Sequence, residues 1–565
     1  MIPSDLDIRN QSLNPRQSFI VEAPAGSGKT ELLIQRYLKL LGGVSQPEEI
    51  LAMTFTRKAA GEMKGRIIEA LNLAQDISPP KEEPDQTTWN LAQVALERNK
   101  KFGWRLLENP ARLRVVTIDS FCSFLTKRTP LLSKIGGATE IQENIQDLHA
   151  TTAKRILSKM ESSNYPYAEL VRALLQHLDN DKKTFINRIS ELLNLRDQWM
   201  ISFFDKFENI KEHLLDNTHK EKLEKIYTEL IEKHLTKTFH LFPESLKTPL
   251  ITFGGYAGKN LNIYDSENPI TALSQLDSFP NPKIKQLNQW KGISNFLLTS
   301  TGEFRKRVDK SLGFPVNNKK IKNEFKIYLE SLTGLKPLQK ALNKIKLLPD
   351  PYFSDYEWNI LRTTLRLLPE LQSQLKRLLQ ENKLSAFSEI SLAALKSFGN
   401  ELEPTDLGKY LDDKIQHILV DEYQDINKVQ QSWLEYLYQI NKNICCVGDD
   451  DQSIYGWRGA RIENIQKIEN DFKPIEVIKL EQNYRSTGNI LSASNALIAN
   501  NQNRLEKSLW TESGDGDLIN VFNARTETEE SHYVVSEIEN QFNQGRNLSE
   551  CAILYRSNAQ SRVFE

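Results

Sequence analysis

The chain has 565 residues, of which 39% are hydrophobic and 26% are charged, and its formal net charge is -1. This length exceeds what one hydrophobic core usually serves, so the sequence predicts several subdomains. Because the net charge is close to zero, any attraction to nucleic acid must come from local groups rather than from the whole molecule.

The sequence has no feature of an exported or membrane-bound protein. Its four cysteines, Cys122, Cys445, Cys446 and Cys551, show no paired ligand spacing, which argues against a zinc site or a disulfide framework. The first residues contain no basic start followed by an apolar run, and no stretch reaches the ~18 apolar residues of a membrane span. We therefore expect a reducing, cytoplasmic location.

Short apolar runs rich in β-branched residues predict the buried parallel strands of an α/β fold. In chain order these runs are 19–23, 50–55, 115–118, 417–420 and 444–448. The long stretch between the third and fourth runs has a mostly helical pattern, which indicates an α/β domain interrupted by a helical insertion. A second α/β pattern follows Asp471, with strands predicted at 477–480, 519–524 and 551–556, and it stops in mid-pattern at Glu565.

These patterns predict four segments. A first α/β domain comprises residues 1–135 and 406–471, the helical insertion comprises 136–405, and a partial second α/β domain comprises 472–565. Within the insertion, residues 251–269 are rich in glycine and asparagine and predict a loop. Residues 301–348 contain twelve Lys or Arg against four Asp or Glu. This basic segment is interpreted either as a solvated helical face or as a contact surface for a phosphate backbone.

A phosphate-binding loop is predicted between the first strand and an amphipathic helix. Its glycines allow successive backbone N–H groups to turn toward the β- and γ-phosphates of a nucleotide, and Lys29 adds a mobile positive charge. The hydroxyl of Thr30 is placed to ligate Mg²⁺ at the positive end of the helix. A chance match is the alternative, but the strand–loop–helix setting disfavours it. The loop residues are Ala23, Pro24, Ala25, Gly26, Ser27, Gly28, Lys29 and Thr30, with alanine in place of the first glycine of the usual pattern.

A pair of carboxylates follows the predicted strand 417–420. Asp421 would hold Mg²⁺, directly or through water, and Glu422 would orient and deprotonate an attacking water. An adjacent Asp–Glu pair is also a common surface feature. Here the preceding strand and the phosphate-binding loop favour a catalytic interpretation.

Further segments narrow the class of nucleotide hydrolase. They read TFTRKAAGEMKGRI (54–67), VVTIDSF (115–121), GDDDQSIYGWRGA (448–460) and LEQNYRST (480–487). Together with the two motifs above, and in this order, they resemble the superfamily 1 DNA helicases of the UvrD/Rep/PcrA and RecB/AddA type. The resemblance implies a RecA-like P-loop NTPase domain with a large helical insertion, followed by an incomplete second RecA-like domain. It also implies ATP and Mg²⁺ in the cleft between the two halves.

The segment 448–460 combines groups for two ligands. Gln452 resembles the glutamine of the family that senses the γ-phosphate, and Trp457 resembles the aromatic residue against which a DNA base stacks. Tyr455 lies on the same short segment and is assigned to the DNA side with it. Stacking on an aromatic ring contributes about 1–3 kcal/mol per base and is indifferent to base identity. The alternative for Trp457 is a buried core residue, which its glycine and arginine neighbours disfavour.

The resemblance also assigns residues to the nucleotide. Tyr484 resembles the residue that stacks on adenine, and Arg485 resembles the arginine that reaches the γ-phosphate from the second domain. Arg66 corresponds to a further arginine on the nucleotide side, with an exposed helix charge as the alternative. Gln11 is the candidate for the glutamine that reads adenine. Glu31, grouped with these residues, stands where the UvrD branch has an arginine that packs on adenine.

The DNA side is assigned to the segment after the second strand. Thr54, Phe55, Thr56 and Lys58 would contact the DNA, where hydroxyls and a lysine suit phosphates and the phenyl ring suits a base or the core. Asp119 stands where the UvrD branch usually carries a histidine, so one DNA contact of the family lacks its cation.

The two halves of the chain resemble different branches. Residues 1 to about 440 look like the RecB/AddA helicases, whereas the residues after 447 look closely UvrD-like. Two motifs of the family would lie beyond Glu565, which predicts a truncated or hybrid product. The sequence shows no nuclease motif of the PD-(D/E)XK type.

The expected activity is ATP-dependent translocation or unwinding of DNA in the 3′ to 5′ direction, in repair or recombination. The expected DNA partner is a single strand or a duplex with a 3′ single-stranded tail. One alternative is a catalytically impaired remnant that binds DNA and nucleotide without turnover. Another is a metabolic P-loop kinase, which would leave Trp457 and the segment 483–487 unexplained.

Overall fold

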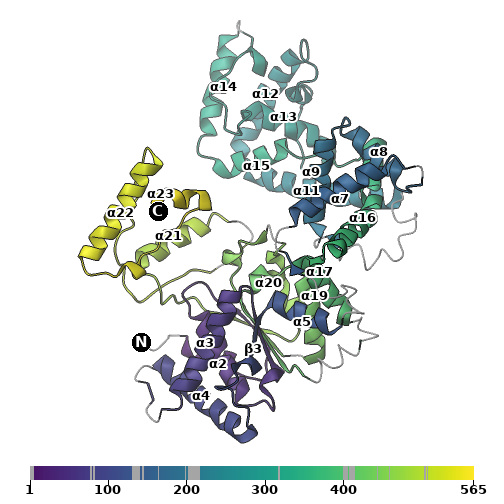
Figure 1. Cartoon of the computed structure of the whole chain (residues 1–565). Helices are drawn as coiled ribbons and strands as arrows, with labels where there is room; N and C mark the ends of the chain where they lie inside the picture. The colour runs from purple at the N-terminus through teal and green to yellow at the C-terminus, as the bar shows by residue number, and fades with distance from the viewer. Residues whose placement is uncertain are drawn as a thin grey trace. The chain divides into compact units, whose positions relative to one another are not determined.

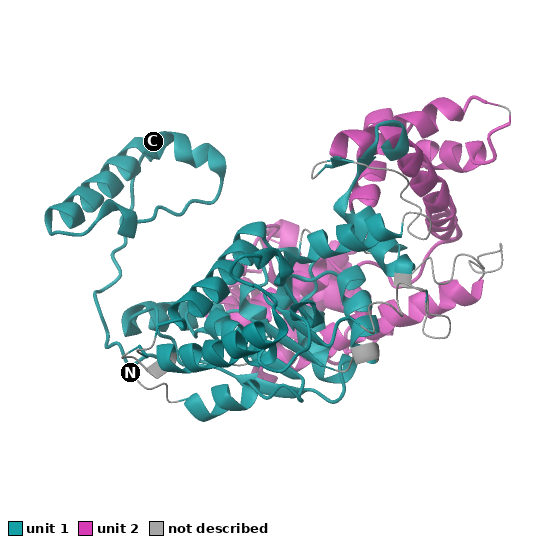
Figure 2. Cartoon of the chain, turned by 60° about the horizontal axis from the view of Figure 1, so that its bottom comes forward, with its two compact units in different colours: residues 1–145, 195–202, 379–565 teal, residues 146–194, 203–378 magenta. Residues whose placement is uncertain are grey.

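The computed structural model describes most of the chain (Figure 1). The residues described are 5–76, 79–80, 83–129, 140–142, 145–162, 164–196, 199–200, 217–315, 318–398, 405, 414–441, 443–456, 459–501, 504–505 and 507–565. Two compact units are present (Figure 2). Unit 1 contains residues 1–145, 195–202 and 379–565, and unit 2 contains residues 146–194 and 203–378.

Unit 1 is built on a six-stranded parallel sheet. Its strands are β1 (Phe19–Glu22), β2 (Ile50–Thr54), β3 (Arg114–Thr117), β6 (His417–Val420), β7 (Ile444–Gly448) and β8 (Glu476–Lys479). They are arranged in the order β3-β2-β6-β7-β1-β8. The five runs predicted for the first α/β domain are confirmed as strands. The run at 477–480 is also a strand, but it does not begin a second sheet, because β8 pairs with β1 with Phe19 opposite Glu476.

Both faces of this sheet are covered by helices, which explains why its strands are almost wholly apolar. Successive side chains of a strand point to opposite faces, so Val21 and Ile20 enter different cores. One core lies under α2 (Lys29–Leu41), α3 (Arg57–Leu73) and α4 (Glu83–Phe102). The other lies under α5 (Ile118–Arg128), α17 (Phe387–Phe398), α19 (Lys428–Asn441) and α20 (Ile462–Asp471). A short helix, α1 (Leu6–Ser12), precedes β1.

The last part of unit 1 differs from the prediction. It contains α21 (Gly488–Ile498), α22 (Glu527–Asn543) and α23 (Ser561–Phe564), but residues 519–524 and 551–556 are not strands. Within the described residues neither segment pairs with a strand of a sheet, and an extended segment without such pairing is not stable as a strand. Val521 and Leu554 are accordingly 84% and 94% exposed.

Unit 2 is helical, and it lies inside the range predicted for the insertion. Its helices are α7 (Gln146–Lys159), α8 (Ala168–His177), α9 (Lys182–Asn194), α11 (Asn217–Leu241), α12 (Glu244–Leu261), α13 (Leu287–Leu297), α14 (Lys319–Ser331), α15 (Lys336–Lys346) and most of α16 (Asp355–Glu381). Its core contains stacked phenylalanines, with the ring centroids of Phe296 and Phe325 4.6 Å apart.

The prediction of a loop at 251–269 is wrong for residues 251–261. Residues up to Leu261 belong to α12, which packs against a 3₁₀ turn at Pro269–Leu273. A Cβ atom on Gly258 would lie 2.7 Å from the backbone nitrogen of Ser274. The glycines of this segment therefore serve close packing of a helix rather than a loop.

In the described helices, no segment is both long enough and apolar enough to span a membrane.

Candidate functional site

The phosphate-binding loop connects the end of β1 to the start of α2. Gly26 and Gly28 adopt φ angles of 80° and 79°, a left-handed conformation that favours glycine. Ser27 donates a hydrogen bond from Oγ to the carbonyl oxygen of Pro24 at 2.8 Å, which tightens the turn. Lys29 and Thr30 are the first two residues of α2, so both lie at the positive end of the helix dipole.

The carboxylate pair lies beside this loop. β6 ends at Val420, and the backbone N–H of Asp421 continues the sheet pairing by donating to the carbonyl of Met53 at 2.8 Å. The ammonium group of Lys29 lies 2.7 Å from Oε2 of Glu422. The fold thus brings together two motifs that are almost 400 positions apart in the sequence. A phosphate-binding lysine and a catalytic carboxylate at one site fit the chemistry of nucleotide hydrolysis.

The two acidic residues are held under electrostatic and conformational strain. Burial, together with the adjacent charge of Glu422, raises the pKa of Asp421 from 3.8 to about 6, against the opposing effect of Lys29. Glu422 has a φ angle of 52°, which is unfavourable for a residue with a side chain. Such a combination is characteristic of functional sites.

Two residues of the same turn join this site although the sequence analysis did not single them out. The amide of Gln424 donates from Nε2 to Oε2 of Glu422 at 2.8 Å, and its Oε1 accepts from the backbone N–H of Asp449 at 3.0 Å. Burial and the charge of Glu422 raise the pKa of Asp425 to about 7. The sequence feature that could have identified Gln424 and Asp425 was their position, two and three residues after Glu422 on the turn that follows β6.

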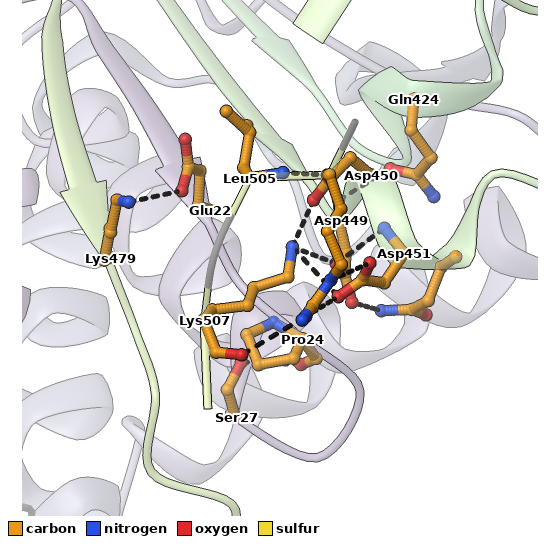
Figure 3. Close-up of polar contacts among 12 residues, drawn as sticks. Glu22, Pro24, Ser27, Gln424, Asp449, Asp450, Asp451, Lys479, Leu505 and Lys507 are labelled. Carbon is orange, nitrogen blue, oxygen red and sulfur yellow. Dashed lines mark hydrogen bonds and ion pairs between the residues drawn. The ribbon is translucent and has the colours of Figure 1, made fainter. Parts of the chain in front are cut away.

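The loop after β7 carries three aspartates and Gln452. Gln452 donates from its side-chain amide to the carboxylate of Asp449. The carboxylate oxygens of Asp449, Asp450 and Asp451 come within 4.8 Å of one another, a spacing that would also suit a cation. In this structure the cation is a lysine. Figure 3 shows the ammonium group of Lys507 directed into the cluster, where it pairs with Asp449 and Asp450.

The side chain of Lys507 is 4% exposed, and the neighbouring carboxylates stabilise its charged form. Burial alone would lower its pKa, but Asp449 and Asp450 outweigh that effect, so its pKa lies above the ordinary value. Arg504 pairs with the third carboxylate, with Nε 2.9 Å from Oδ1 of Asp451. The sequence analysis did not predict this pairing, because these cations lie more than fifty positions away from the aspartates.

The segment 483–487 is docked directly on the phosphate-binding loop. Asn483 donates from Nδ2 to the carbonyl of Ala25 at 2.7 Å, and the N–H of Tyr484 donates to the carbonyl of Gly26 at 2.8 Å. A Cβ on Gly26 would lie 2.8 Å from Cβ of Arg485, so only glycine permits this approach. The structure therefore places Tyr484 and Arg485 next to the loop, as the nucleotide-side assignment requires.

The other residues assigned to the nucleotide make contacts within unit 1. Glu31 pairs with Arg66 and accepts a hydrogen bond from the hydroxyl of Thr88 at 2.6 Å, which ties α2 to α3 and α4. Gln11 donates to the side chain of Glu476 at the start of β8. The roles of Gln11, Glu31 and Arg66 toward a nucleotide stay predictions.

The described residues assigned to DNA lie where β2 leads into α3 and on the loop after β7. The rings of Phe55 and Tyr455 have their centroids 4.8 Å apart, which brings these two loops together. Thr56 caps α3 by accepting from the N–H of Ala59 at 3.1 Å, Thr54 is buried and Lys58 is exposed. Trp457 lies outside the described residues, and its proposed stacking role stays a prediction.

A glycine-containing loop joins a strand to a helix, with a lysine at its end, and an acidic pair directly follows another strand of the same parallel sheet. Together these features define a RecA-like P-loop NTPase fold. The family model for the UvrD/REP helicase N-terminal domain matches residues 6–238 and 208–473. The model for the UvrD-like helicase C-terminal domain matches residues 478–565. The chain therefore belongs to the UvrD/REP helicase family.

Curated relatives match a part of the chain closely. DNA helicase II of Haemophilus influenzae is 51% identical over 179 residues, which is 32% of this chain and 24% of that protein. DNA helicase II of Escherichia coli is 52% identical over 179 residues, with the same shares covered. The ATP-dependent DNA helicase PcrA of Staphylococcus epidermidis is 48% identical over 190 residues, 34% of this chain and 26% of that protein. The matched segment thus spans about a quarter of the length of each relative.

Proposed function

We propose that this chain is an ATP-dependent DNA helicase or translocase of the 3′ to 5′ class that acts in DNA repair or recombination. Its DNA would be a single strand or a duplex with a 3′ single-stranded tail. The observation that carries the proposal is the 2.7 Å contact between Lys29 and Glu422, with the segment 483–487 hydrogen-bonded to the same loop. Family membership and the relatives named DNA helicase support it.

The residues of the site fit a magnesium nucleotide. The N–H groups of the loop and the ammonium of Lys29 would bind the phosphates, and Thr30 and Asp421 would hold Mg²⁺. When bound, Mg²⁺ supplies positive charge beside the phosphates. The near-complete burial of Asp421 supports this assignment, because an almost dry carboxylate at the end of a strand is stabilised by a cation.

The chain's own groups then account for hydrolysis. Glu422 would orient a water and accept its proton, and this requires that Lys29 leave Glu422 for the nucleotide phosphates. Arg485 would stabilise charge on the transferred phosphoryl group, and Gln452 would contact the γ-phosphate. Thr54, Phe55, Thr56, Lys58, Tyr455 and Trp457 would contact the DNA strand.

The finer assignments are part of the same proposal. Residues 1 to about 440 are nearer to the RecB/AddA branch, which the loop motif VEAPAGSGKTELL and the large helical unit support. The proposed compartment is the cytoplasm, because all four cysteines are unpaired and would stay reduced there.

The test is Glu422→Gln in the full chain. Wild-type protein should hydrolyse ATP faster when single-stranded DNA is added. The variant should bind a fluorescent ATP analogue normally while hydrolysis falls by roughly 10²–10⁴-fold, because a general base is lost and the shape is kept. Glu69→Gln, an exposed residue of α3, is the matched control and should hydrolyse ATP at the wild-type rate. A Glu422→Gln variant with the wild-type rate would contradict the proposal.

A further inference from the structure

An arginine of the first helix is packed against the phosphate-binding loop. The side chain of Arg9 in α1 is only 11% exposed. Its Nη2 donates to the carbonyl oxygen of Ser27 at 2.5 Å, and a Cβ on Gly28 would lie 3.2 Å from its Nη1. The guanidinium group thus lies directly on the turn that precedes Lys29.

The same guanidinium group faces the ring of Tyr484. Cζ of Arg9 lies 5.6 Å from the centroid of that ring, within the range of a cation–π contact. Asp5 holds both side chains, since it accepts from Nε of Arg9 at 2.7 Å and from the hydroxyl of Tyr484 at 3.2 Å. Tyr484 is therefore fixed on three sides: by Arg9, by Asp5 and by its own N–H bond to Gly26.

Part of the tyrosine ring stays accessible. Tyr484 as a whole is 38% exposed although its hydroxyl and its backbone are both bonded. A flat aromatic side chain held rigidly beside a phosphate-binding loop presents a surface on which a purine base can stack. Arg9 supplies the cation that lies against this ring, and Asp5 holds both side chains in place.

We propose that Arg9 is a positioning residue of the base-binding part of the nucleotide site: it holds Tyr484 above the phosphate-binding loop so that the base of a purine nucleoside triphosphate stacks on the exposed part of the ring. The inference rests on the proposed binding of ATP and names a residue of this chain that defines how the base is held. It assigns α1 to the nucleotide site through Arg9 and Asp5.

The experiment compares ATP with inorganic tripolyphosphate, which carries the phosphates without a base. Both are measured as competitors of a fluorescent ATP analogue on the full chain. Arg9→Ala should weaken ATP binding about 10-fold, because Tyr484 loses its cation–π contact. Tripolyphosphate binding should stay within about twofold, because Arg9 bonds to the loop at the carbonyl of Ser27, while Lys29 and the N–H groups that would bind the phosphates are kept. In steady-state hydrolysis the KM for ATP should rise by a similar factor with little change in kcat.

Three further variants make the result specific. Arg9→Lys keeps the charge without the planar fork and should fall between wild type and Arg9→Ala. Arg16→Ala removes an exposed arginine near α1 and should leave both competitors unchanged. In a Tyr484→Leu background, Arg9→Ala should have no additional effect on ATP, because the ring through which it acts is gone.

Two results would overturn the inference. Equal weakening of ATP and tripolyphosphate by Arg9→Ala would show that Arg9 only supports the phosphate-binding loop. Unchanged ATP binding would show that Tyr484 needs no such support. Since the readout is binding, it is separate from turnover: a wild-type chain that binds ATP without hydrolysing it would contradict the proposed activity and not the role of Arg9.

Discussion

At the scale of single residues, Asp421 and Glu422 are unfavourably placed for stability. Asp421 is 4% exposed with another carboxylate next to it in the chain, and Glu422 occupies a left-handed backbone conformation. A non-glycine residue in that region costs of order 1–3 kcal/mol, and a buried carboxylate is costly in its charged form. The surrounding sheet, together with Lys29 and Gln424, holds both residues against these costs, which places the strain at the proposed site of hydrolysis.

Asp421→Asn should separate this stability cost from function. The pKa of Asp421 is about 6 in the folded chain against an ordinary value of 3.8, so the folded state binds the proton more tightly than the unfolded state. This group therefore makes the free energy of unfolding fall as pH rises from about 4 to about 6, and the cost is fully present above that window. The amide cannot ionise, so the variant should be more stable than wild type by roughly 1–3 kcal/mol near pH 7.5 and nearly equal to it near pH 4.

Urea unfolding at both pH values measures this difference, and the same variant should lose ATP hydrolysis by about 100-fold or more because a proposed Mg²⁺ ligand is removed. Asp76→Asn, at an exposed position, is the control and should show neither effect. A stability difference that does not depend on pH would contradict the assigned cause.

At the scale of elements, one short segment links the loop of Gln452 to the segment 483–487. Lys507 and Arg504 pair with the three aspartates, and the backbone N–H of Leu505 donates to Asp450 at 2.7 Å. A few residues later the carbonyl of Trp510 accepts from the N–H of Asn483 at 2.8 Å. Residues 504–505 and 507–510 therefore bond to the aspartates just before Gln452 and to Asn483, two residues before Arg485. Their ion pairs hold Asp449, the partner of Gln452.

Lys507→Met should test this link. The change leaves Asp449 and Asp450 buried without their cation, and breaking a buried ion pair by removing one partner typically costs about 3–5 kcal/mol. The free energy of unfolding should fall by an amount of that order, and kcat for ATP should fall because Gln452 loses its fixed partner. Adding Asp450→Asn to Lys507→Met should recover part of the loss, since one uncompensated charge is removed.

The control for this pair is Lys467→Met on α20, where the lysine is exposed and the effect should stay within about 0.5 kcal/mol. Urea unfolding of wild type, Lys507→Met, Asp450→Asn and the double variant gives the coupling free energy between Lys507 and Asp450. A coupling near zero would mean that water or another cation neutralises the cluster.

At the scale of the whole molecule, local sequence patterns predicted most of the strands but could not predict which distant segments contact one another. Apolar runs of β-branched residues identified β1, β2, β3, β6, β7 and β8. The four central strands are almost wholly buried and carry no alternation that could be misread, while the edge strands β3 and β8 are partly exposed. The place of β8 beside β1 depends on sheet topology, which no local pattern encodes. The glycines at 254–258 were misread as a loop because their function, close packing of α12 on a 3₁₀ turn, requires a distant partner.

The candidate site likewise contains residues that the sequence predicted and residues that it did not. The loop residues, Lys29 and the acidic pair were predictable, since their spacing relative to a strand carries the chemistry. Arg9 and Lys507 were not, because an arginine in a short helix and a lysine in a connecting segment resemble ordinary surface charges until the fold buries them. The segments 519–524 and 551–556 show the converse: a strand-like pattern is insufficient where no described neighbour completes the hydrogen bonding.

The two units should respond differently to nucleotide. Every residue proposed to bind ATP lies in unit 1, and unit 2 has its own core around Phe296 and Phe325. A ligand stabilises only the structure that binds it, by about 2.7 kcal/mol at a hundred times its dissociation constant. ATP with Mg²⁺ should therefore slow amide hydrogen exchange in α2 and α19 and leave α13 and α14 unchanged.

Two variants serve as controls for this hydrogen-exchange prediction. Lys29→Ala should abolish the protection of α2, because the phosphates lose their cation. Phe325→Ala should speed exchange in α13 and α14, since removing a fully buried phenylalanine costs about 3–5 kcal/mol, and it should leave the response of α2 to ATP intact. Equal protection of all four helices by ATP would instead mean that the two units open as one cooperative body, so that nucleotide bound in unit 1 also stabilises the helical core of unit 2.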